Sequence, residues 1–270
     1  MLMRLNDLSM FVDERGNSDA TPLLFIHGFP FDHSMWRHQM SHFSAGHHVF
    51  APDLRGHGDT REVEHRSANV TVNTLADDLI TLLDSALGNQ SRLTICGLSL
   101  GGYTAFELWR LIPNRIERLI LADTKAAPDT PEVRERRKSQ AEQVAIHGAR
   151  AISDGMLDSL LAPVHRHGVV GMEVRRMIES TDPQEITRIL NALATRPDST
   201  ATLPTITVPT LVIVGELDKI TPLSDSRYMV QAIGNTARLA VIPEAGHLTA
   251  LENPSAFNTA LSNFLALYQH

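Results

Sequence analysis

A serine between glycines is the first feature that could do chemistry, since residues 97–102 read Gly-Leu-Ser-Leu-Gly-Gly. Residues 93–96 before it are mostly apolar, as in a buried strand, and residues 103–111 after it have the composition of a helix. A sharp strand-to-helix turn exposes the serine hydroxyl, and glycines two residues away on either side let other backbone segments approach. This context predicts Ser99 as a nucleophile. A serine that caps an ordinary helix is the alternative.

A carboxylate and a histidine follow two later strand-like segments. Asp218 comes shortly after the β-branched run 210–214, and His247 follows the apolar run 239–242. The carboxyl ends of parallel strands meet at one edge of a sheet, so both side chains are expected near Ser99. A histidine can take the serine proton as general base, while a carboxylate fixes the imidazole tautomer. We predict these roles for His247 and Asp218.

Asp123 is a rival for the orienting carboxylate, because it also follows a predicted strand, 116–122. Asp218 is preferred, since its strand is the stronger of the two and Gly215 frees the backbone where the chain must turn. Asp123 can instead anchor the segment that follows it. Asp218 has its own alternative, as a turn residue that caps the helix after Pro222.

Two backbone N–H groups are expected to stabilise the negative oxygen of a tetrahedral intermediate. One is the N–H of Leu100, directly after the serine and at the start of a helix. The other is assigned to Phe29, in the sequence His-Gly-Phe-Pro after the apolar run 23–26. Pro30 lacks an N–H and favours extended geometry at Phe29. His27 is interpreted as a hydrogen-bonding residue under this loop, with a catalytic histidine as the alternative.

The segments that must hold these residues alternate between strand and helix patterns. Strands are expected at 23–26, 49–51, 93–96, 116–122, 210–214 and 239–242, and helices at 72–87, 103–111 and from Pro254 onward. Weak alternation at 8–12, before a turn signal at 13–17, suggests an opening antiparallel hairpin. Strands alternating with helices imply a mostly parallel, doubly wound sheet covered on both faces, so the predicted fold class is α/β.

Residues 125–205 interrupt this alternation. No convincing strand occurs in them, and helical patterns recur at 131–147, 149–161, 171–179 and 183–194. We predict a helical cap over 125–205, inserted between two parts of an α/β core at 1–124 and 206–270. Six apolar cap residues suggest an acyl pocket, with packing of the cap helices as the alternative for most of them, namely Met156, Leu157, Leu160, Met172, Met177 and Ile178. The basic cluster 134–138 is interpreted as a solvent-exposed helix face, with carboxylate steering as the alternative.

Other residues that could do chemistry have plainer interpretations. His38 and His42 are four residues apart and can share a helix face, but no third ligand is evident, so no metal site is predicted. Cys96 is the single cysteine and is interpreted as a small core residue at a strand end. The chemistry predicted for Ser99 needs no cofactor.

The composition limits the class of protein. The 270 residues are 43% hydrophobic and 20% charged, which suits one large α/β domain with an insertion. The net charge of −7 argues against binding to nucleic acid, which demands a cationic face. No apolar run has the length of a signal peptide core or a membrane span. We therefore expect a soluble, cytoplasmic protein with no membrane partner.

These motifs together resemble the α/β-hydrolase superfamily, and most of all its bacterial carboxylesterase and enol-lactonase branch. The resemblance rests on HGFP at 27–30, PDLRGHG at 52–58, GLSLGG at 97–102, GELD at 215–218 and GH at 246–247. It implies hydrolysis of a small, partly apolar ester or lactone through an acyl-enzyme. A serine at position 99 argues against the dehalogenase and epoxide-hydrolase branches, which use aspartate there. Carbon–carbon hydrolases, lyases, perhydrolases and ligand receptors with a protein partner occur on the same fold, and these alternatives stay open.

Overall fold

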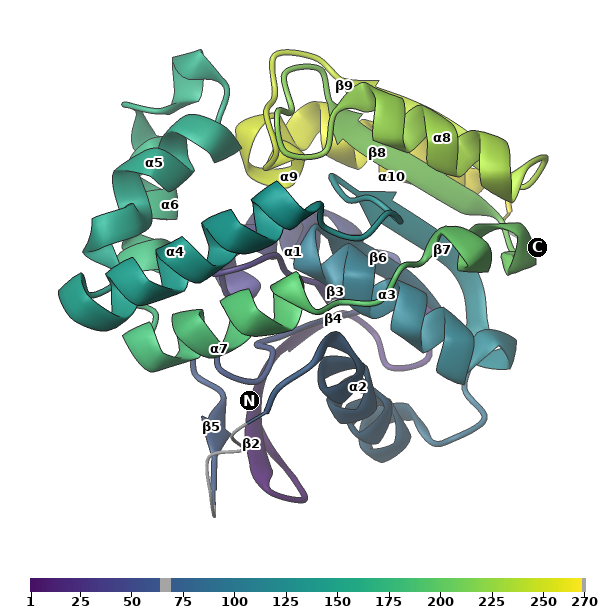
Figure 1. Ribbon diagram of the computed structural model, residues 1–270. Coiled ribbons are helices and arrows are strands. Elements are labelled where there is room, and N and C mark those ends of the chain that lie inside the picture. Colours follow the sequence, from purple (N-terminus) through teal and green to yellow (C-terminus); the bar gives the residue numbers. More distant parts are fainter. Residues whose placement is uncertain (64–68, 269–270) are drawn as a thin grey trace.

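A sheet of nine strands forms the centre of the molecule, counted within residues 1–63 and 69–268, the part of the chain that the computed structural model describes (Figure 1). The order is β1-β2-β4-β3-β6-β7-β8-β9, and β5 pairs with β2 beside this path. The strands are β1 (Leu2–Leu5), β2 (Leu8–Arg15), β3 (Pro22–Ile26), β4 (His48–Pro52), β5 (Arg61–Glu62), β6 (Leu93–Leu98), β7 (Ile116–Ala122), β8 (Thr210–Gly215) and β9 (Ala237–Ile242). From β4 to β9 along this order all pairings are parallel, which confirms the predicted α/β class.

The N-terminal hairpin differs from its prediction. β1 and β2 pair antiparallel through a turn at Asn6 and Asp7, where Asn6 has a φ of 51°. Asparagine tolerates this left-handed region because its short polar side chain can bond locally. The predicted turn at 13–17 is partly strand, since β2 runs to Arg15 and pairs antiparallel with β4. The neighbouring strand supplies hydrogen-bond partners that a local pattern does not reveal.

Helices cover both faces of the sheet, where two clusters of buried apolar side chains lie. One cluster includes residues of α2 (Val72–Leu87), α3 (Leu100–Leu111) and α8 (Leu223–Ile233), and the other includes residues of α1 (Arg37–Phe43) and α10 (Pro254–Ala266). The shorter helices are η1 (His33–Trp36), η2 (Pro113–Arg115), η3 (Pro163–His165), η4 (Thr200–Thr205) and α9 (Thr249–Glu252). The parallel strands are thus fixed from both sides, and their carboxyl ends stay accessible for a site.

A group of helices between β7 and β8 in the sequence lies beside the sheet, at the left of Figure 1. These helices are α4 (Pro131–His147), α5 (Arg150–Leu160), α6 (Val169–Ser180) and α7 (Pro183–Ala194), and residues 125–205, all of them described, contain no strand. α4 packs against α7, and α5 packs against α6. Val144, Ile186 and Leu190 belong to an apolar cluster that joins α4, α5 and α7. We call α4–α7 the helical insertion.

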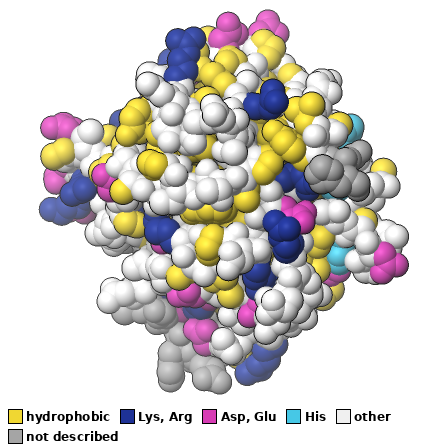
Figure 2. All heavy atoms as spheres, turned by 90° about the vertical axis from the view of Figure 1, so that its right-hand side faces the viewer, with side chains coloured by type: hydrophobic (Ala, Val, Ile, Leu, Met, Phe, Trp, Pro, Cys, Tyr) yellow, Lys and Arg dark blue, Asp and Glu magenta, His cyan; other side chains and the backbone are white. Residues whose placement is uncertain are grey.

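The outer surface mixes charge and apolar groups. On the face that lies at the right of Figure 1, acidic, basic and hydrophobic side chains are interspersed (Figure 2). The net charge of −7 is therefore not gathered into one acidic patch on that face. Among the described residues, no helix combines the length and the apolar character needed to cross a bilayer.

Candidate active site

Ser99 stands at the tight turn between β6 and α3, with a φ of 54° and a ψ of −109°. A strained backbone of this kind persists where the surrounding structure fixes it. Close packing does so here. A Cβ on Gly97 would lie 2.2 Å from the Gly101 oxygen, and a Cβ on Gly101 would lie 2.1 Å from the Ile26 oxygen. Sterics therefore require glycine on both sides of the serine.

His247 lies between Ser99 and Asp218 in one chain of hydrogen-bonding atoms. Its Nε2 is 2.9 Å from the Ser99 Oγ, and its Nδ1 is 2.8 Å from the Asp218 Oδ2. His247 and Asp218 are buried, while Ser99 is half-buried. The two buried residues follow the neighbouring parallel strands β9 and β8, which deliver them to the same edge of the sheet. When Nδ1 donates to Asp218, Nε2 can accept the proton of Ser99.

Thr221 completes the partners of Asp218 and was not predicted from the sequence. Its hydroxyl donates to Asp218 Oδ2 at 2.6 Å, and the N–H groups of Ile220 and Thr221 donate to Oδ1. Burial opposes ionisation of Asp218, but the charge of His247 and the hydrogen bonds of His247 and Thr221 outweigh it and lower the pKa of Asp218. Asp218 is therefore held as a carboxylate. A local signal for Thr221 exists, because a threonine three residues after an aspartate can bond its side chain.

Asp123 contacts other groups. Its Oδ1 accepts from the Gly215 N–H at 2.9 Å, and its Oδ2 accepts from the hydroxyl of Thr249. Complete burial, and then the charge of Asp218, raise the pKa of Asp123 well above its ordinary value. Asp123 therefore joins the ends of β7 and β8 to the segment that carries His247, rather than bonding the imidazole.

Phe29 and Leu100 are the two residues whose N–H groups were predicted to bind the oxyanion. Phe29 belongs to the loop after β3 and lines the same cavity as Ser99 and His247. Leu100 is the first residue of α3, and helix geometry leaves its N–H without an acceptor inside the helix. The positive end of the α3 dipole therefore points toward the position of the serine.

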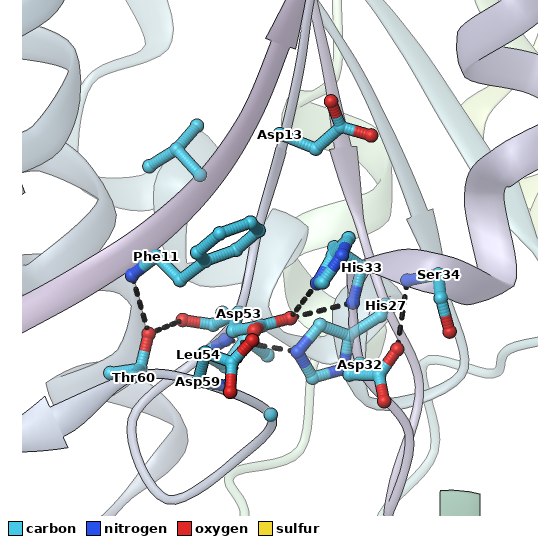
Figure 3. A network of polar contacts seen from close by, with 12 residues as sticks. Phe11, Asp13, His27, Asp32, His33, Ser34, Asp53, Leu54, Asp59 and Thr60 are labelled. Atoms are coloured by element: carbon cyan, nitrogen blue, oxygen red, sulfur yellow. Dashed lines mark hydrogen bonds and ion pairs between the residues drawn. The ribbon is translucent and has the colours of Figure 1, made fainter. Parts of the chain in front are cut away.

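A polar network holds the loop after β3 against the loop after β4 (Figure 3). His27 is fully buried, its Nδ1 lies 2.9 Å from the Gly28 oxygen, and its Nε2 accepts from the Leu54 N–H at 2.9 Å. Burial lowers the pKa of His27 well below its ordinary value. Asp53 Oδ1 accepts from the His33 N–H at 2.6 Å and lies 2.8 Å from His33 Nδ1. His27 is thus a neutral brace under the loop that carries Phe29.

Asp32, His33 and Asp53 offer ligand atoms within 4.8 Å of one another, as a metal site would. Protein donors already occupy the carboxylates. The second oxygen of Asp53 accepts from the Asp59 N–H at 2.7 Å, and Asp32 accepts from the Ser34 N–H at 2.8 Å. These bonds explain the cluster as part of the loop network in Figure 3.

The other residues singled out in the sequence take no part in the hydrogen bonds between Ser99, His247 and Asp218. Cys96 is buried in β6, where burial and then the charge of Asp123 raise the pKa of its thiol. A raised pKa keeps a thiol protonated and unreactive. His38 and His42 are exposed on α1, and His42 Nε2 lies 3.1 Å from the Ser262 Oγ.

A cavity of about 580 Å³ opens beside Ser99 and His247, between the core and the helical insertion. Its apolar lining consists of Phe29, Tyr103, Val133, Met156, Leu160, Leu190, Leu193 and Ile220. Of the residues predicted for an acyl pocket, Met156 and Leu160 line it. The prediction was wrong for Leu157, Met177 and Ile178, which are buried in the apolar core, and for Met172, which is 64% exposed. Periodicity marks an apolar helix face but does not separate packing residues from cavity residues.

Cations outnumber carboxylates around this cavity. The charged lining residues are Lys125, Asp129, Arg136, Arg137, Asp158 and Lys219. Both acids are paired, Asp129 with Arg137 at 2.5 Å and with Arg196 at 2.9 Å, and Asp158 with Arg166 at 3.3 Å. Within the described part of the chain, no carboxylate lies within 4.0 Å of Lys125, Arg136 or Lys219. The cavity is therefore cationic, in a protein with a net charge of −7.

α4 supplies one wall of this cationic cavity. Its lining residues Val133, Arg136, Arg137 and Gln140 have the spacing of one helix face. Lys125, on the loop after β7, is half-buried, and burial followed by the charge of Arg196 lowers its pKa. In the basic cluster 134–138, Arg134, Arg136 and Lys138 are exposed, as the interpretation of a solvent-exposed helix face expects, and Arg136 and Arg137 also line the cavity.

Comparisons with known proteins define the class. Residues 23–260 match the alpha/beta hydrolase family. The 3-oxoadipate enol-lactonase 1 of Acinetobacter baylyi is 27% identical over 279 residues, which cover 100% of this chain and 97% of that protein. A thermophilic esterase from Thermogutta terrifontis, solved with malate bound, has a TM-score of 0.90 and 35% identity, covering 96% of this chain and 94% of that one. The enol-lactonase from Burkholderia xenovorans LB400 has a TM-score of 0.89 and 28% identity, covering 98% and 100%.

The chain belongs to the alpha/beta hydrolase family. The matches to enol-lactonases and to an esterase over nearly the whole chain confirm the predicted carboxylesterase and enol-lactonase branch. The chain is a carboxylic ester hydrolase, and its family hydrolyses esters and lactones.

Proposed function

We propose that the chain hydrolyses a carboxylic ester or lactone through an acyl-enzyme on Ser99. As Ser99 Oγ attacks the carbonyl carbon, His247 Nε2 takes its proton, and the Asp218 carboxylate stabilises the imidazolium. The imidazolium then protonates the leaving alkoxide as the carbon–oxygen bond breaks. Water attacks the acyl-enzyme and gives a proton to His247. His247 returns this proton to Ser99 Oγ as the bond between Oγ and the acyl carbon breaks, and the free acid leaves. The chain of contacts at 2.9 and 2.8 Å from Ser99 to Asp218 is the observation that carries this proposal.

The N–H groups of Phe29 and Leu100 are proposed to bind the oxyanion of both tetrahedral intermediates. The Leu100 N–H lies at the start of α3, where the helix dipole also favours negative charge. The buried network around His27 keeps the Phe29 loop in place. Donors that are fixed before the reaction need no rearrangement as the charge develops.

The helical insertion, within residues 125–205, is proposed to act as the cap that selects the substrate. It contributes Met156 and Leu160 to the apolar lining of the cavity and Arg136 to the cationic part. An acyl chain against Met156 and Leu160 gains apolar burial. No metal or cofactor has a role in this mechanism.

The cationic lining of the cavity favours a substrate that carries a carboxylate in addition to the ester or lactone that is cleaved. Lys125 and Arg136 have no carboxylate partner within 4.0 Å among the described residues, and an acidic substrate would supply one. The name of the relative 3-oxoadipate enol-lactonase indicates a substrate derived from an acid. Hydrogen bonds to charged groups typically contribute about 1.5–3 kcal/mol, enough to favour an acidic substrate about tenfold or more.

A matched pair of esters tests this preference. Methyl pentanoate and the monomethyl ester of glutaric acid have acyl chains of equal length, and the glutarate adds one charge. We expect Lys125→Met to raise KM for the glutarate about tenfold and to leave kcat/KM for methyl pentanoate near the wild-type value. Added salt should reduce the preference of the wild-type enzyme as well. Equal losses on both esters would contradict the carboxylate assignment.

A panel of acyl esters, lactones and β-diketones, with identification of the products, tests the reaction class. The proposal expects turnover of esters or lactones with release of the free acid. Cleavage of the diketones alone would indicate a carbon–carbon hydrolase, and a peracid formed with hydrogen peroxide would indicate a perhydrolase. Binding without turnover would indicate a receptor.

A further inference from the structure

Glu252 is a buried carboxylate beside His247 that has no part in the proposed proton transfer. It is the last residue of α9 and is 6% exposed. Its Oε1 accepts from the N–H groups of Gly246 at 2.9 Å and Leu248 at 3.1 Å, and its Oε2 accepts from the Ala162 N–H at 2.7 Å. Three backbone donors thus converge on one side chain.

Two of these bonds hold the residues that flank His247. Because one oxygen accepts from both Gly246 and Leu248, the peptide units before and after the histidine are drawn to a common point. The N–H of His247 itself donates to the Leu160 oxygen at 2.7 Å. Three successive backbone N–H groups are therefore bonded, and this fixes the direction in which the imidazole leaves the chain.

The third bond reaches the helical insertion. Ala162 follows α5, and Leu160 at the end of α5 lines the cavity. The two segments are in direct contact, since a Cβ on Gly246 would lie 2.6 Å from the Leu160 oxygen and 2.8 Å from the Ala162 nitrogen. One carboxylate therefore ties the wall of the cavity to the backbone that carries the imidazole.

We propose that Glu252 is a positioning residue, which aims the His247 imidazole at Ser99 and couples it to the segment 160–162 of the cavity wall. This inference rests on the proposed function of His247 as general base. A carboxylate suits the task because it only accepts hydrogen bonds, with two oxygens that have about four lone-pair sites. An amide of the same shape has one oxygen, and its NH2 group would face an N–H donor.

The test compares Glu252→Gln with Glu107→Gln. Glu107 is also 6% exposed, and it pairs with Arg110 on α3, outside the cavity lining, so it controls for loss of a buried carboxylate. With p-nitrophenyl acetate we expect Glu252→Gln to lower kcat by a factor of about 10 to 100, the scale of a small misplacement of a reacting group, and to change KM little. The Glu107→Gln variant should keep the wild-type kcat.

A proton NMR spectrum adds a readout that does not depend on turnover. The His247 Nδ1 proton, in its hydrogen bond to Asp218, should give a far-downfield resonance in the wild type and in Glu107→Gln. In Glu252→Gln this resonance should shift or broaden. An unchanged resonance together with an unchanged kcat would overturn the proposal, and so would a loss confined to KM.

A loss of folding and a loss of catalysis can be told apart in these variants. Thermal unfolding and circular dichroism check each variant, and Glu252→Asp, which keeps the charge but is one methylene shorter, is the second variant. If neither Glu252 variant folds, the carboxylate serves the fold as a whole and the proposal is wrong. If Ser99→Ala keeps wild-type turnover, the proposed function fails, while the resonance of His247 still decides whether Glu252 orients the imidazole.

Discussion

Two buried aspartates, Asp123 and Asp218, follow the neighbouring strands β7 and β8, but their pKa values are shifted in opposite directions. The charge and hydrogen bond of His247 lower the pKa of Asp218 despite its burial. Complete burial and the charge of Asp218 raise the pKa of Asp123. One group is therefore suited to stabilise an imidazolium, and the other to join loops.

Substitution of each aspartate by asparagine should separate these roles. A triad carboxylate fixes the tautomer of the histidine, so Asp218→Asn should lower kcat by about 10⁴. Asp123→Asn leaves the contact between His247 and Asp218 in place and should lower kcat far less. Steady-state kinetics on p-nitrophenyl acetate, with thermal unfolding of both variants as control, measures the difference. A crippled Asp123→Asn beside an active Asp218→Asn would mean that the acid is on the other strand.

The raised pKa of Asp123 predicts a pH dependence of stability. A carboxyl whose pKa is raised on folding contributes stability that is fully present below its unfolded pKa, about 3.9. That contribution is lost as pH rises through the raised pKa, because the folded state resists losing the proton. In urea unfolding from pH 4 to 9, the free energy of unfolding should fall with pH less steeply in Asp123→Asn than in the wild type. Parallel curves would contradict the raised pKa.

The role of a residue could be predicted where its neighbours in the sequence carry the signal. It could not be predicted where the residue contacts groups that are far away in the sequence. Ser99 has a local signal in its glycines. Glu252 acts on backbone groups of residues 162, 246 and 248, a set that only folding assembles. A weak signal exists, since a carboxylate at the last residue of α9 opposes the helix dipole and needs other partners.

The helices of the helical insertion carry two kinds of apolar residue, those that line the cavity and those that pack in the core. Met156 on α5 lines the cavity, while Met177 on α6 is 1% exposed and packs in the core. Both are methionines in the predicted acyl-pocket set. They form a matched pair for testing which residues contact the substrate.

Met156→Ala should change acyl-chain preference, and Met177→Ala should change stability. The first variant enlarges the cavity, so the ratio of kcat/KM for p-nitrophenyl octanoate over acetate should change about tenfold. The second creates a cavity in the core and should cost about 2–5 kcal/mol of unfolding free energy while keeping that ratio. Chain-length profiles and urea unfolding of both variants measure these effects. A changed profile in Met177→Ala alone would show that the cavity wall is assigned to the wrong helix.

Element boundaries followed from the sequence where capping residues mark them. α2 begins after Thr71, whose side chain accepts from the Thr74 N–H, and ends before Gly88, whose φ is 79°. The end of β2 could not be predicted from the sequence, because pairing with β4 extends the strand past its apolar residues. α1 was also missed, since its seven residues are too few for a clear apolar period.

At the scale of the whole molecule, alternating strands and helices were enough to predict a mostly parallel α/β sheet. The order of the strands was beyond such a pattern, because β4 lies between β2 and β3 although it follows both in sequence. The cationic cavity was equally hidden. It brings together Lys125 after β7, Arg136 on α4 and Lys219 after β8, which are close only in the folded chain.

Labelling with a fluorophosphonate, followed by intact-mass and peptide-mapping mass spectrometry, identifies the nucleophile of this protein. Such a probe reports on a serine that a neighbouring base activates, and we expect one adduct per chain, on Ser99. The Ser99→Ala variant should fold, take no label, and lose about 10⁶ in kcat. An adduct on another residue, or wild-type turnover by Ser99→Ala, would contradict the assignment of Ser99 as nucleophile.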